Sequence, residues 1–283
     1  MLQRLFVTGW TLAVLIALFG QTASAAVTLT DLNSSATFDG ANPSNQVSWI
    51  VDGVSQLFQQ SFYFRVGSTG DETTLSTGFT SETQLDPSFF RQSYVFSGFT
   101  VDVSYTLTGG SAGSGESDLN EVIRIRNTGA TALDMHFFQY VDFDLGGSPG
   151  NDYGWVPAFG RVAQAEPGTT LAETVVTPVP DHYEMSLYPS ILNSFSDGLP
   201  TQLSDTPGVY PAGFVFGDVA WAFEWDETIG VGGTFIISKD KNITSRSPEN
   251  GPLVPEPASM VIWGVGAGAM GLAGFWRRKR VAV

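Results

Sequence analysis

Strict alternation of apolar and polar residues dominates the middle of the chain. In residues 99–108 an aliphatic or aromatic residue occupies every odd position and a polar residue occupies every even position. A period of two places successive side chains on opposite faces of an extended chain, so this pattern predicts a half-buried strand. No segment between the two ends of the chain keeps an apolar period of 3.6 residues through three turns. Further strands are predicted at 62–66, 123–126, 132–145, 221–226 and 231–238.

Glycine and proline divide the same region into short segments, which is typical of strands joined by turns. Two longer interruptions are predicted to be loops, the Gly/Ser stretch 109–115 and the proline-rich segment 177–211. Many short strands with frequent turns indicate an all-β fold, and the sequence contains neither a clear internal repeat nor a domain boundary. The sequence therefore predicts a single β-sandwich domain over residues 26–253.

The first residues of the chain have the three zones of a secretory signal peptide. Arg4 gives a positive start, residues 5–19 form an apolar run, and small residues follow at 23–25. We expect cleavage between Ala25 and Ala26, and therefore an exported mature chain. The alternative is an uncleaved anchor helix, for which the apolar run is short, since a membrane span takes roughly 20 residues.

The last part of the chain combines a proline motif, an uncharged apolar segment and a basic cluster. The uncharged segment Ala258–Trp276, at a rise of about 1.5 Å per helical residue, covers most of a hydrocarbon core of about 30 Å. The positive-inside rule places the basic cluster in the cytoplasm and the chain before the motif outside. The alternative is an ordinary C-terminal anchor. The motif is Val254, Pro255, Glu256 and Pro257, and the basic cluster is Arg277, Arg278, Lys279 and Arg280.

This ending resembles the PEP-CTERM sorting signal of Gram-negative bacteria, in which a Pro-Glu-Pro motif, a membrane span and an Arg-rich terminus follow one another. The resemblance is confined to residues 254–283. It implies an exosortase as a partner, a membrane-embedded cysteine transpeptidase that processes the tail. The C-terminal helix would hold the chain in the inner membrane until then. The resemblance further implies delivery to the cell surface or the extracellular matrix.

Composition excludes several classes of function. The absence of cysteine excludes disulfide scaffolds, thiol catalysis and cysteine-based metal sites, and two histidines are too few for a multi-histidine metal centre. A formal net charge of −15 and a pI of 4.3 argue against nucleic acid as a partner, because neutralising phosphates requires clustered Lys and Arg. An acidic surface favours solubility, and it suits neutral glycans, cationic surfaces or divalent ions.

The densest group of oxygen-bearing side chains lies in residues 142–152. If a strand continues to residue 145, the two aspartates in it lie side by side on the solvent face. Clustered oxygen ligands suit Ca²⁺, so this segment is a hypothesis for a calcium site. The alternative is a solvated acidic hairpin loop, since the segment departs from the EF-hand pattern. The candidate ligands are Asp142, Asp144, Asn151 and Asp152.

No catalytic arrangement stands out in the sequence. The two G-x-S-x-G matches, at Ser111 and Ser148, lack the following helix that a nucleophile elbow needs. We interpret His136, in a predicted strand, as a packed or half-exposed residue, and His182 as a loop residue without an assigned role. Two carboxylates are enough for glycoside hydrolysis, but the sequence does not indicate which pair.

Aromatic residues are further candidates for ligand binding, because flat rings stack on sugar faces. Those in or near predicted loops are the candidates for such contacts, whereas those in alternating strands are predicted to be core. The loop group is Tyr153, Trp155 and Tyr188, and the core group is Trp49, Trp221 and Trp225.

These observations favour an exported, exosortase-processed surface or matrix protein, structural or adhesive rather than enzymatic, and associated with extracellular polysaccharide. The alternatives are a calcium-dependent carbohydrate-binding module and, ranked lower, a secreted glycan hydrolase. On this hypothesis the protein requires no cofactor apart from the calcium ion considered above.

Overall fold

A computed structural model describes residues 25–244 of the protein. The expected signal peptide, apart from its last residue, lies outside the described residues. The expected sorting motif, membrane span and basic cluster also lie outside them, so these segments stay predictions. Between residues 25 and 244, no helix is both long and apolar enough to cross a membrane. This part of the chain consists mainly of strands, which confirms the predicted all-β class.

One sheet, which we call sheet A, has nine strands, and all pairings between them are antiparallel. Two short strands pair at its side, β4 (Val54–Ser55) with β3 and β6 (Thr73–Thr74) with β5. The other seven follow the order β1 (Val27–Asp31), β2 (Ser34–Phe38), β3 (Gln46–Val51), β5 (Gln59–Val66), β11 (Leu133–Asp142), β17 (Val219–Ile229) and β15 (His182–Leu187).

The second sheet, sheet B, also has nine antiparallel strands. Helical structure in the described residues is limited to the short segments η1 (Leu75–Gly78), η2 (Leu145–Gly147) and α1 (Ser190–Ser194). The order in sheet B is β16 (Val215–Gly217), β12 (Asp152–Ala158), β13 (Arg161–Glu166), β14 (Thr169–Thr177), β18 (Thr234–Thr244), β10 (Ser117–Asn127), β9 (Phe99–Gly109), β8 (Phe89–Phe96) and β7 (Phe79–Asp86).

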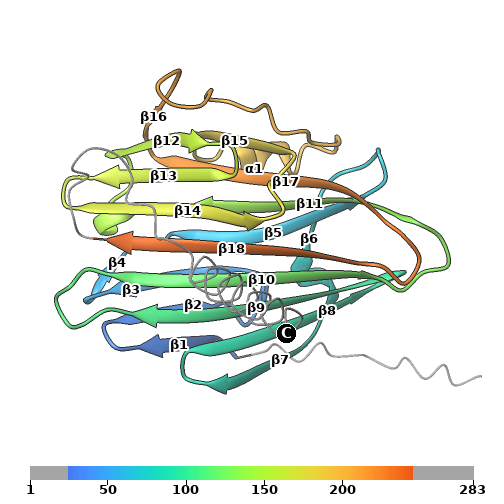
Figure 1. Cartoon of the computed structure of the whole chain (residues 1–283), viewed down its shortest axis with the longest axis horizontal. Coiled ribbons are helices and arrows are strands. Elements are labelled where there is room, and N and C mark those ends of the chain that lie inside the picture. The colour runs from blue at the N-terminus through green and yellow to red at the C-terminus, as the bar shows by residue number, and fades with distance from the viewer. Residues whose placement is uncertain (1–24, 245–283) are drawn as a thin grey trace, which may run out of the picture.

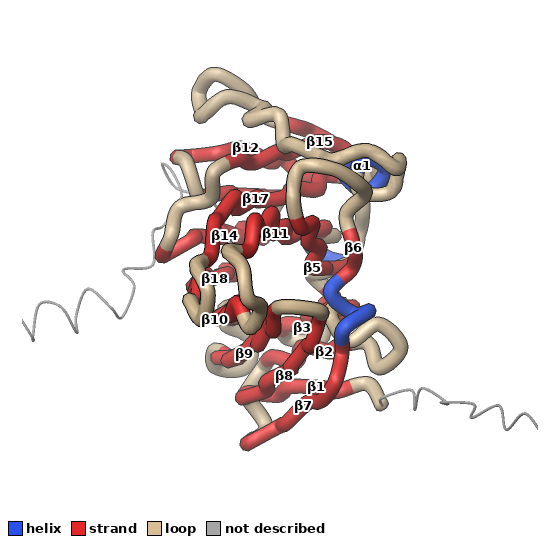
Figure 2. Tube along the Cα trace, turned by 90° about the vertical axis from the view of Figure 1, so that its right-hand side faces the viewer, coloured by secondary structure: helices blue, strands red, loops and turns tan. Residues whose placement is uncertain are grey.

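The two sheets lie face to face, as Figure 1 and the perpendicular view in Figure 2 show. One continuous cluster of buried apolar side chains from both sheets fills the space between them. The predicted alternation of residues 99–108 is confirmed, because every odd position of β9 up to Leu107 is buried. The three tryptophans predicted to be core, Trp49, Trp221 and Trp225, all belong to this cluster.

The two predicted loops differ in outcome. Residues 110–116 connect β9 to β10 as expected, but segment 177–211 is more ordered than expected, since it contains β15 and α1. The chain around α1 packs on the outer face of sheet A and forms a second, smaller apolar cluster there. Part of this face is therefore covered by chain rather than open to solvent. The buried members of this cluster are Phe138, Tyr140, Ile191, Phe195, Leu203, Ala220 and Ala222.

Four charged residues lie between the sheets, each at most 1% exposed. We call them the lysine–glutamate network: Glu121 on β10, Glu173 on β14, and Lys239 and Lys241 on β18. Lys239 forms ion pairs with both glutamates, and Lys241 forms one with Glu121. The opposite charges are equal in number, so the network is neutral when all four groups are ionised.

Sheet A completes the hydrogen bonding of this network across the interior. Gln139 Nε2 donates to Glu173 at 2.6 Å and Trp221 Nε1 donates to the same carboxylate at 2.8 Å. Gln60 Nε2 donates to Glu121 at 2.7 Å. Burial by itself would raise the pKa of Glu121, but the two lysine charges outweigh burial and lower this pKa to about 2. The network thus joins both sheets through paired charges.

Candidate functional site

The strand register brings both histidines of the sequence to the outer face of sheet A. Strands β5, β11 and β17 align Arg65, His136 and Asp226 in one row. In the next row along β17, Glu224 is paired with His182 on β15. Directly paired residues on neighbouring strands point to the same face of a sheet, so these polar side chains form one group.

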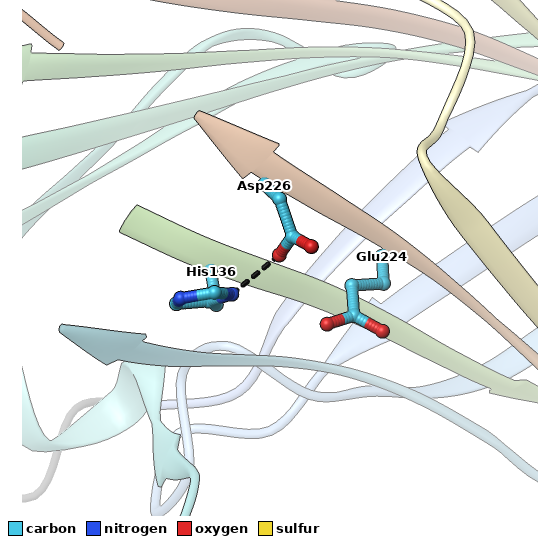
Figure 3. A group of neighbouring side chains, drawn as sticks. All are labelled: His136, Glu224 and Asp226. Atoms are coloured by element: carbon cyan, nitrogen blue, oxygen red, sulfur yellow. Dashed lines mark hydrogen bonds and ion pairs between the residues drawn. The ribbon is translucent and has the colours of Figure 1, made fainter. Parts of the chain in front are cut away.

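His136 and Asp226 form the centre of this group. The imidazole Nδ1 is hydrogen-bonded to Oδ1 of Asp226, and its Nε2 lies 3.9 Å from a carboxylate oxygen of Asp134. Figure 3 shows Glu224 beside the bonded pair, on the same strand as Asp226. One ligand atom from each of His136, Glu224 and Asp226 lies within 4.8 Å of the other two. Carboxylates on both sides therefore fix the orientation of the ring.

Glu224 is fully buried, although it faces away from the interior of the sandwich. The backbone N–H of Leu203 donates to its Oε2 at 2.8 Å, and within residues 25–244 no donor reaches its Oε1. The carboxyl group is in hydrogen-bonding contact with Asp226. Burial, and to a smaller degree the charge of Asp226, raises the pKa of Glu224 to about 8. This carboxyl group is consequently protonated at neutral pH, which makes it a proton donor.

A cavity of about 280 Å³ opens beside these residues. The buried ion pair between Arg65 Nε and Glu72, at 3.1 Å, ties β5 to the wall of the cavity. Glu72 also accepts from the backbone N–H of Thr201 at 2.9 Å and from its hydroxyl at 2.7 Å. The lining is rich in hydrogen-bonding groups, as recognition of a hydroxylated ligand requires. It consists of Arg65, Ser68, His136, Pro200, Thr201, Gln202, Glu224 and Asp226.

His182 lies at the side of this group, at the first position of β15 rather than in a loop. Its Nδ1 is 3.0 Å from Oδ2 of Asp205, and its Nε2 is 3.1 Å from Nε2 of Gln202. Burial lowers the pKa of His182, but the hydrogen bond and charge of Asp205, with the charge of Asp226, give a net rise. His182 thus positions Gln202, which lines the cavity.

Sequence reasoning missed this site. The alternation in 221–226 correctly placed Glu224 and Asp226 on the face opposite Trp221, Phe223 and Trp225, but it did not identify the strands on either side. The only available signal was that His136 and these two acids belong to predicted strands. Their proximity depends on the pairing of β11 with β17, which are far apart in the chain.

A metal ion is one chemical option for the same residues. An imidazole nitrogen with two carboxylates is a donor set that suits Zn²⁺ or another first-row transition metal. The hydrogen bond between His136 and Asp226 uses one atom of each potential ligand, so metal binding would have to replace it. Proton transfer needs no such rearrangement.

The four residues predicted to bind calcium do not form one group. Asp142 ends β11 and is only 1% exposed, so its predicted place on a solvent face was wrong. Its neighbours on this face, Tyr140 and Ala220, belong to the covered apolar cluster. The side chain of Asn151 accepts a hydrogen bond from the Ser148 hydroxyl at 3.1 Å and donates one to the Glu166 carboxylate at 3.1 Å.

In the structure Asp218, which is distant in the sequence, lies close to Asp142 and Asp144. Carboxylate oxygens of Asp142, Asp144 and Asp218 lie within 4.8 Å of one another, and we call these three residues the aspartate cluster. Burial, followed by the charges of Asp218 and Asp144, raises the pKa of Asp142 to about 7. Burial is also the main reason why the pKa of Asp152, at the start of β12, rises to about 8.

The aromatic residues considered for sugar stacking lie mainly at the end of sheet B. Tyr153 and Trp155 are in β12 rather than in a loop, and Tyr153 is 49% exposed. Tyr188 follows β15 and is 42% exposed.

No protein-family model matches the sequence, and no curated protein matches it either. Solved structures do match in fold. One is a bacterial glucoamylase complexed with acarbose, with a TM-score of 0.56 and 8% identity over 77% of this chain and 31% of that chain. The protein therefore spans less than a third of the glucoamylase chain.

Two further matches extend over nearly the whole of the matched chain. A putative aldose 1-epimerase from Escherichia coli K12 has a TM-score of 0.50 and 10% identity over 78% of this chain and 99% of that chain. An aldose epimerase homologue from C. elegans has a TM-score of 0.51 and 8% identity over 80% of this chain and 100% of that chain. At such identities the similarity shows a shared fold.

These matches correct the expectation of a structural or adhesive protein without enzyme activity. The matched structures are named as enzymes of carbohydrate chemistry or as homologues of such enzymes. The expectation depended on the lack of a catalytic arrangement in the sequence. That reasoning was wrong because His136, Glu224 and Asp226 come together only when the sheet forms.

Proposed function

We propose that the protein is a carbohydrate-active enzyme that interconverts the anomers of an aldose by proton transfer. The observation that carries this proposal is the pair Glu224 and Asp226, a buried acid with a raised pKa next to a carboxylate held by His136. Two neighbouring groups whose environments differ in this way are suited to act as acid and base. Both line the cavity described above.

The reaction needs one acid and one base on the same small molecule. Glu224 donates its proton to the ring oxygen of the sugar, and Asp226 removes the proton from the anomeric hydroxyl. The bond between the anomeric carbon and the ring oxygen breaks, and the open-chain aldehyde forms. Rotation of the aldehyde and the reverse transfers close the ring as the other anomer and restore both residues. His136 acts as a positioning residue, since its Nδ1 holds one oxygen of Asp226.

The close approach of the two carboxyl groups suits this reaction. One oxygen of each lies within 4.8 Å of the other. The two oxygens of a hemiacetal share one carbon, so a closely spaced acid and base can reach both.

The cavity supports a small sugar as the substrate. Its volume of about 280 Å³ lies just below the range of roughly 300–1,000 Å³ for ligand sites, so it suits a small ligand. Arg65, Thr201 and Gln202 surround it with polar groups that suit hydroxyls. The names of the matched epimerases and of the glucoamylase add a fold-level analogy in the same direction.

The test is the rate of anomer exchange, measured by NMR exchange spectroscopy on glucose, galactose and other aldoses with the full chain in mild detergent. We expect saturable acceleration, which Glu224→Gln reduces by about 10²–10⁴-fold because an amide cannot release a proton. The matched control is Glu227→Gln, an exposed neighbour on the same strand, which should keep the wild-type rate. The wild-type rate should fall as the pH rises through about 8, where Glu224 loses its proton.

Two results would refute the proposal. One is the absence of acceleration for every aldose when circular dichroism reports a folded protein. The other is equal activity of the Glu224→Gln and Glu227→Gln variants. Release of sugar from oligosaccharides without anomer exchange would assign the site to hydrolysis instead.

We further propose that this enzyme is exported and sorted through its ends. The signal peptide ending at Ala25, the motif Pro255-Glu256-Pro257 and the basic cluster 277–280 support processing by an exosortase and release towards extracellular polysaccharide. Neutral residues at 277–280 should remove the cytoplasmic charge anchor and impair surface delivery. Cell fractionation with an antibody to the strand domain tests this, and unchanged delivery would contradict it.

A further inference from the structure

The aspartate cluster occupies the opposite end of the face that carries the candidate active site. His136 and Asp142 lie on the same face of β11, six residues apart, which corresponds to about 20 Å at about 3.3 Å per residue. Asp144 precedes η2, and Asp218 precedes β17. The cluster is therefore a separate feature of the fold.

Its carboxylates lack the partners that buried charges normally have. Asp142, 1% exposed, accepts one hydrogen bond, from the Tyr140 hydroxyl at 3.2 Å, and within residues 25–244 no donor reaches its Oδ1. Asp152 nearby is 0% exposed, and the side-chain amide of Gln164 is its hydrogen-bonding neighbour. This amide also donates to the carbonyl of Phe143 at 2.7 Å.

Positive charge is also missing from this region. Across residues 25–244, neither lysine nor arginine forms an ion pair with any of these four aspartates. Buried polar atoms without partners are rare because leaving water costs free energy that only a new partner returns. The buried Oδ1 of Asp142, which receives no donor from the described residues and lies in a group with the carboxylates of Asp144 and Asp218, suits a cation as its partner.

We propose that Asp142, Asp144 and Asp218 bind one calcium ion, with Asp152 adding negative charge at the side. The donor set contains only oxygen, which suits hard cations, and partly exposed Asp144 and Asp218 leave room for the water ligands that calcium accepts. Asn151, also expected as a ligand from the sequence, accepts a hydrogen bond from Ser148 at its side-chain oxygen. Asp218, far away in the sequence, takes its place.

The ion would connect the two sheets. Asp142 ends a strand of sheet A, and Asp218 lies between β16 of sheet B and β17 of sheet A. Calcium at this point is a structural ion rather than part of the sugar site, so this inference is independent of the proposed function. Its principal measurable effect is on stability.

The first experiment compares thermal unfolding of the full chain in excess EDTA and in a calcium titration. A ligand at 100 times its Kd stabilises by about 2.7 kcal/mol, which corresponds to a rise of roughly 5–10 °C in Tm for a domain of this size. We expect a saturable rise of this order and a weaker response to Mg²⁺, which demands stricter octahedral geometry. A Tm that is the same in EDTA and in millimolar calcium would overturn the proposal.

Substitution of one aspartate of the cluster should change both the Tm in EDTA and the rise of Tm with calcium. Asp218→Asn removes one repelling charge, so it should raise Tm in EDTA, but it also removes a ligand and should abolish most of the rise with calcium. The control Asp71→Asn removes the same charge from an exposed position outside the cluster, and it should keep the full calcium response. A full response in both variants would also overturn the proposal. Failure of these tests would leave the anomer-exchange assay unaffected.

Discussion

The lysine–glutamate network and the aspartate cluster both place carboxylates out of contact with water, yet they differ in what neutralises them. In the network each glutamate is ion-paired with lysine, and amide and indole groups of sheet A donate further hydrogen bonds to both carboxylates. In the cluster the carboxylates face one another. The pKa of Glu121 is accordingly lowered, whereas the pKa of Asp142 is raised.

The difference separates structural charge from functional charge. A buried group whose partners all belong to the chain has no chemical capacity left for a ligand. A buried group with an unpaired oxygen retains that capacity, and its retention costs stability. Glu224, held by one N–H and with one unpaired oxygen, resembles the cluster in this respect. Both proposals concern groups of the second kind.

The largest effect is expected from breaking the network. Lys239→Met leaves two buried glutamates with one lysine, and removal of one partner of a buried pair costs about 3–5 kcal/mol. Urea denaturation measures the loss. The control is Arg91→Met, which breaks a surface ion pair of 2.8 Å with Asp102, where a loss below about 1 kcal/mol is expected. Equal losses in the two variants would mean that the network contributes no more than a surface pair.

The two regions should respond to pH in opposite directions. The folded pKa of Glu121 is about 2, below its ordinary 4.5, so its contribution is present above pH 4.5 and is lost as the pH falls through 2. The folded pKa of Asp142 is about 7, above 3.8, so its contribution is present below pH 3.8 and is lost as the pH rises through 7. The contribution of Glu121 amounts to about 3 kcal/mol and that of Asp142 to about 4 kcal/mol.

Thermal unfolding in EDTA between pH 2 and 8 measures both the loss of stability at low pH and the loss at higher pH. We expect a maximum of Tm in the acidic range, with a decrease on either side. Asp142→Asn should flatten the decrease towards pH 8 and leave the decrease towards pH 2 unchanged. An unaltered decrease towards pH 8 in this variant would contradict the role given to Asp142.

The smallest effect concerns the one donor that serves the aspartate cluster. Tyr140→Phe removes the hydroxyl that donates to Asp142 at 3.2 Å, and a loss of about 1 kcal/mol is expected in EDTA. Urea denaturation measures it, with Tyr63→Phe on the same face as the control. A loss above about 3 kcal/mol would mean that Asp142 depends on chain donors as strongly as the network does.

Local pattern was sufficient to predict several of the strands and, in them, most of the residues that face the core. Residues 99–108 form β9 with the expected buried face, and the tryptophans of 221–226 are buried. Such features depend on a period of two within one segment, so they are readable without knowledge of neighbouring strands.

The sites were not predictable, because they depend on which strands pair. Asp218 is near Asp144 only because β17 lies beside β11, and Glu224 meets His136 for the same reason. Lys239 and Lys241 occupy core-facing positions of β18, where a residue-type rule would expect solvent. Their partners lie on β10 and β14, so only the assembled sheet explains their burial.

The lysine–glutamate network also specifies the register in which β18 pairs with β10. In the observed register Lys239 is paired with Glu121. A slip of one residue would turn both lysines outward and, in one direction, place Asp240 opposite Glu121 in the interior. Two carboxylates would then be buried together without a cation, which is a costly arrangement. Aliphatic residues tolerate several alignments, whereas alternating charge in the interior specifies one.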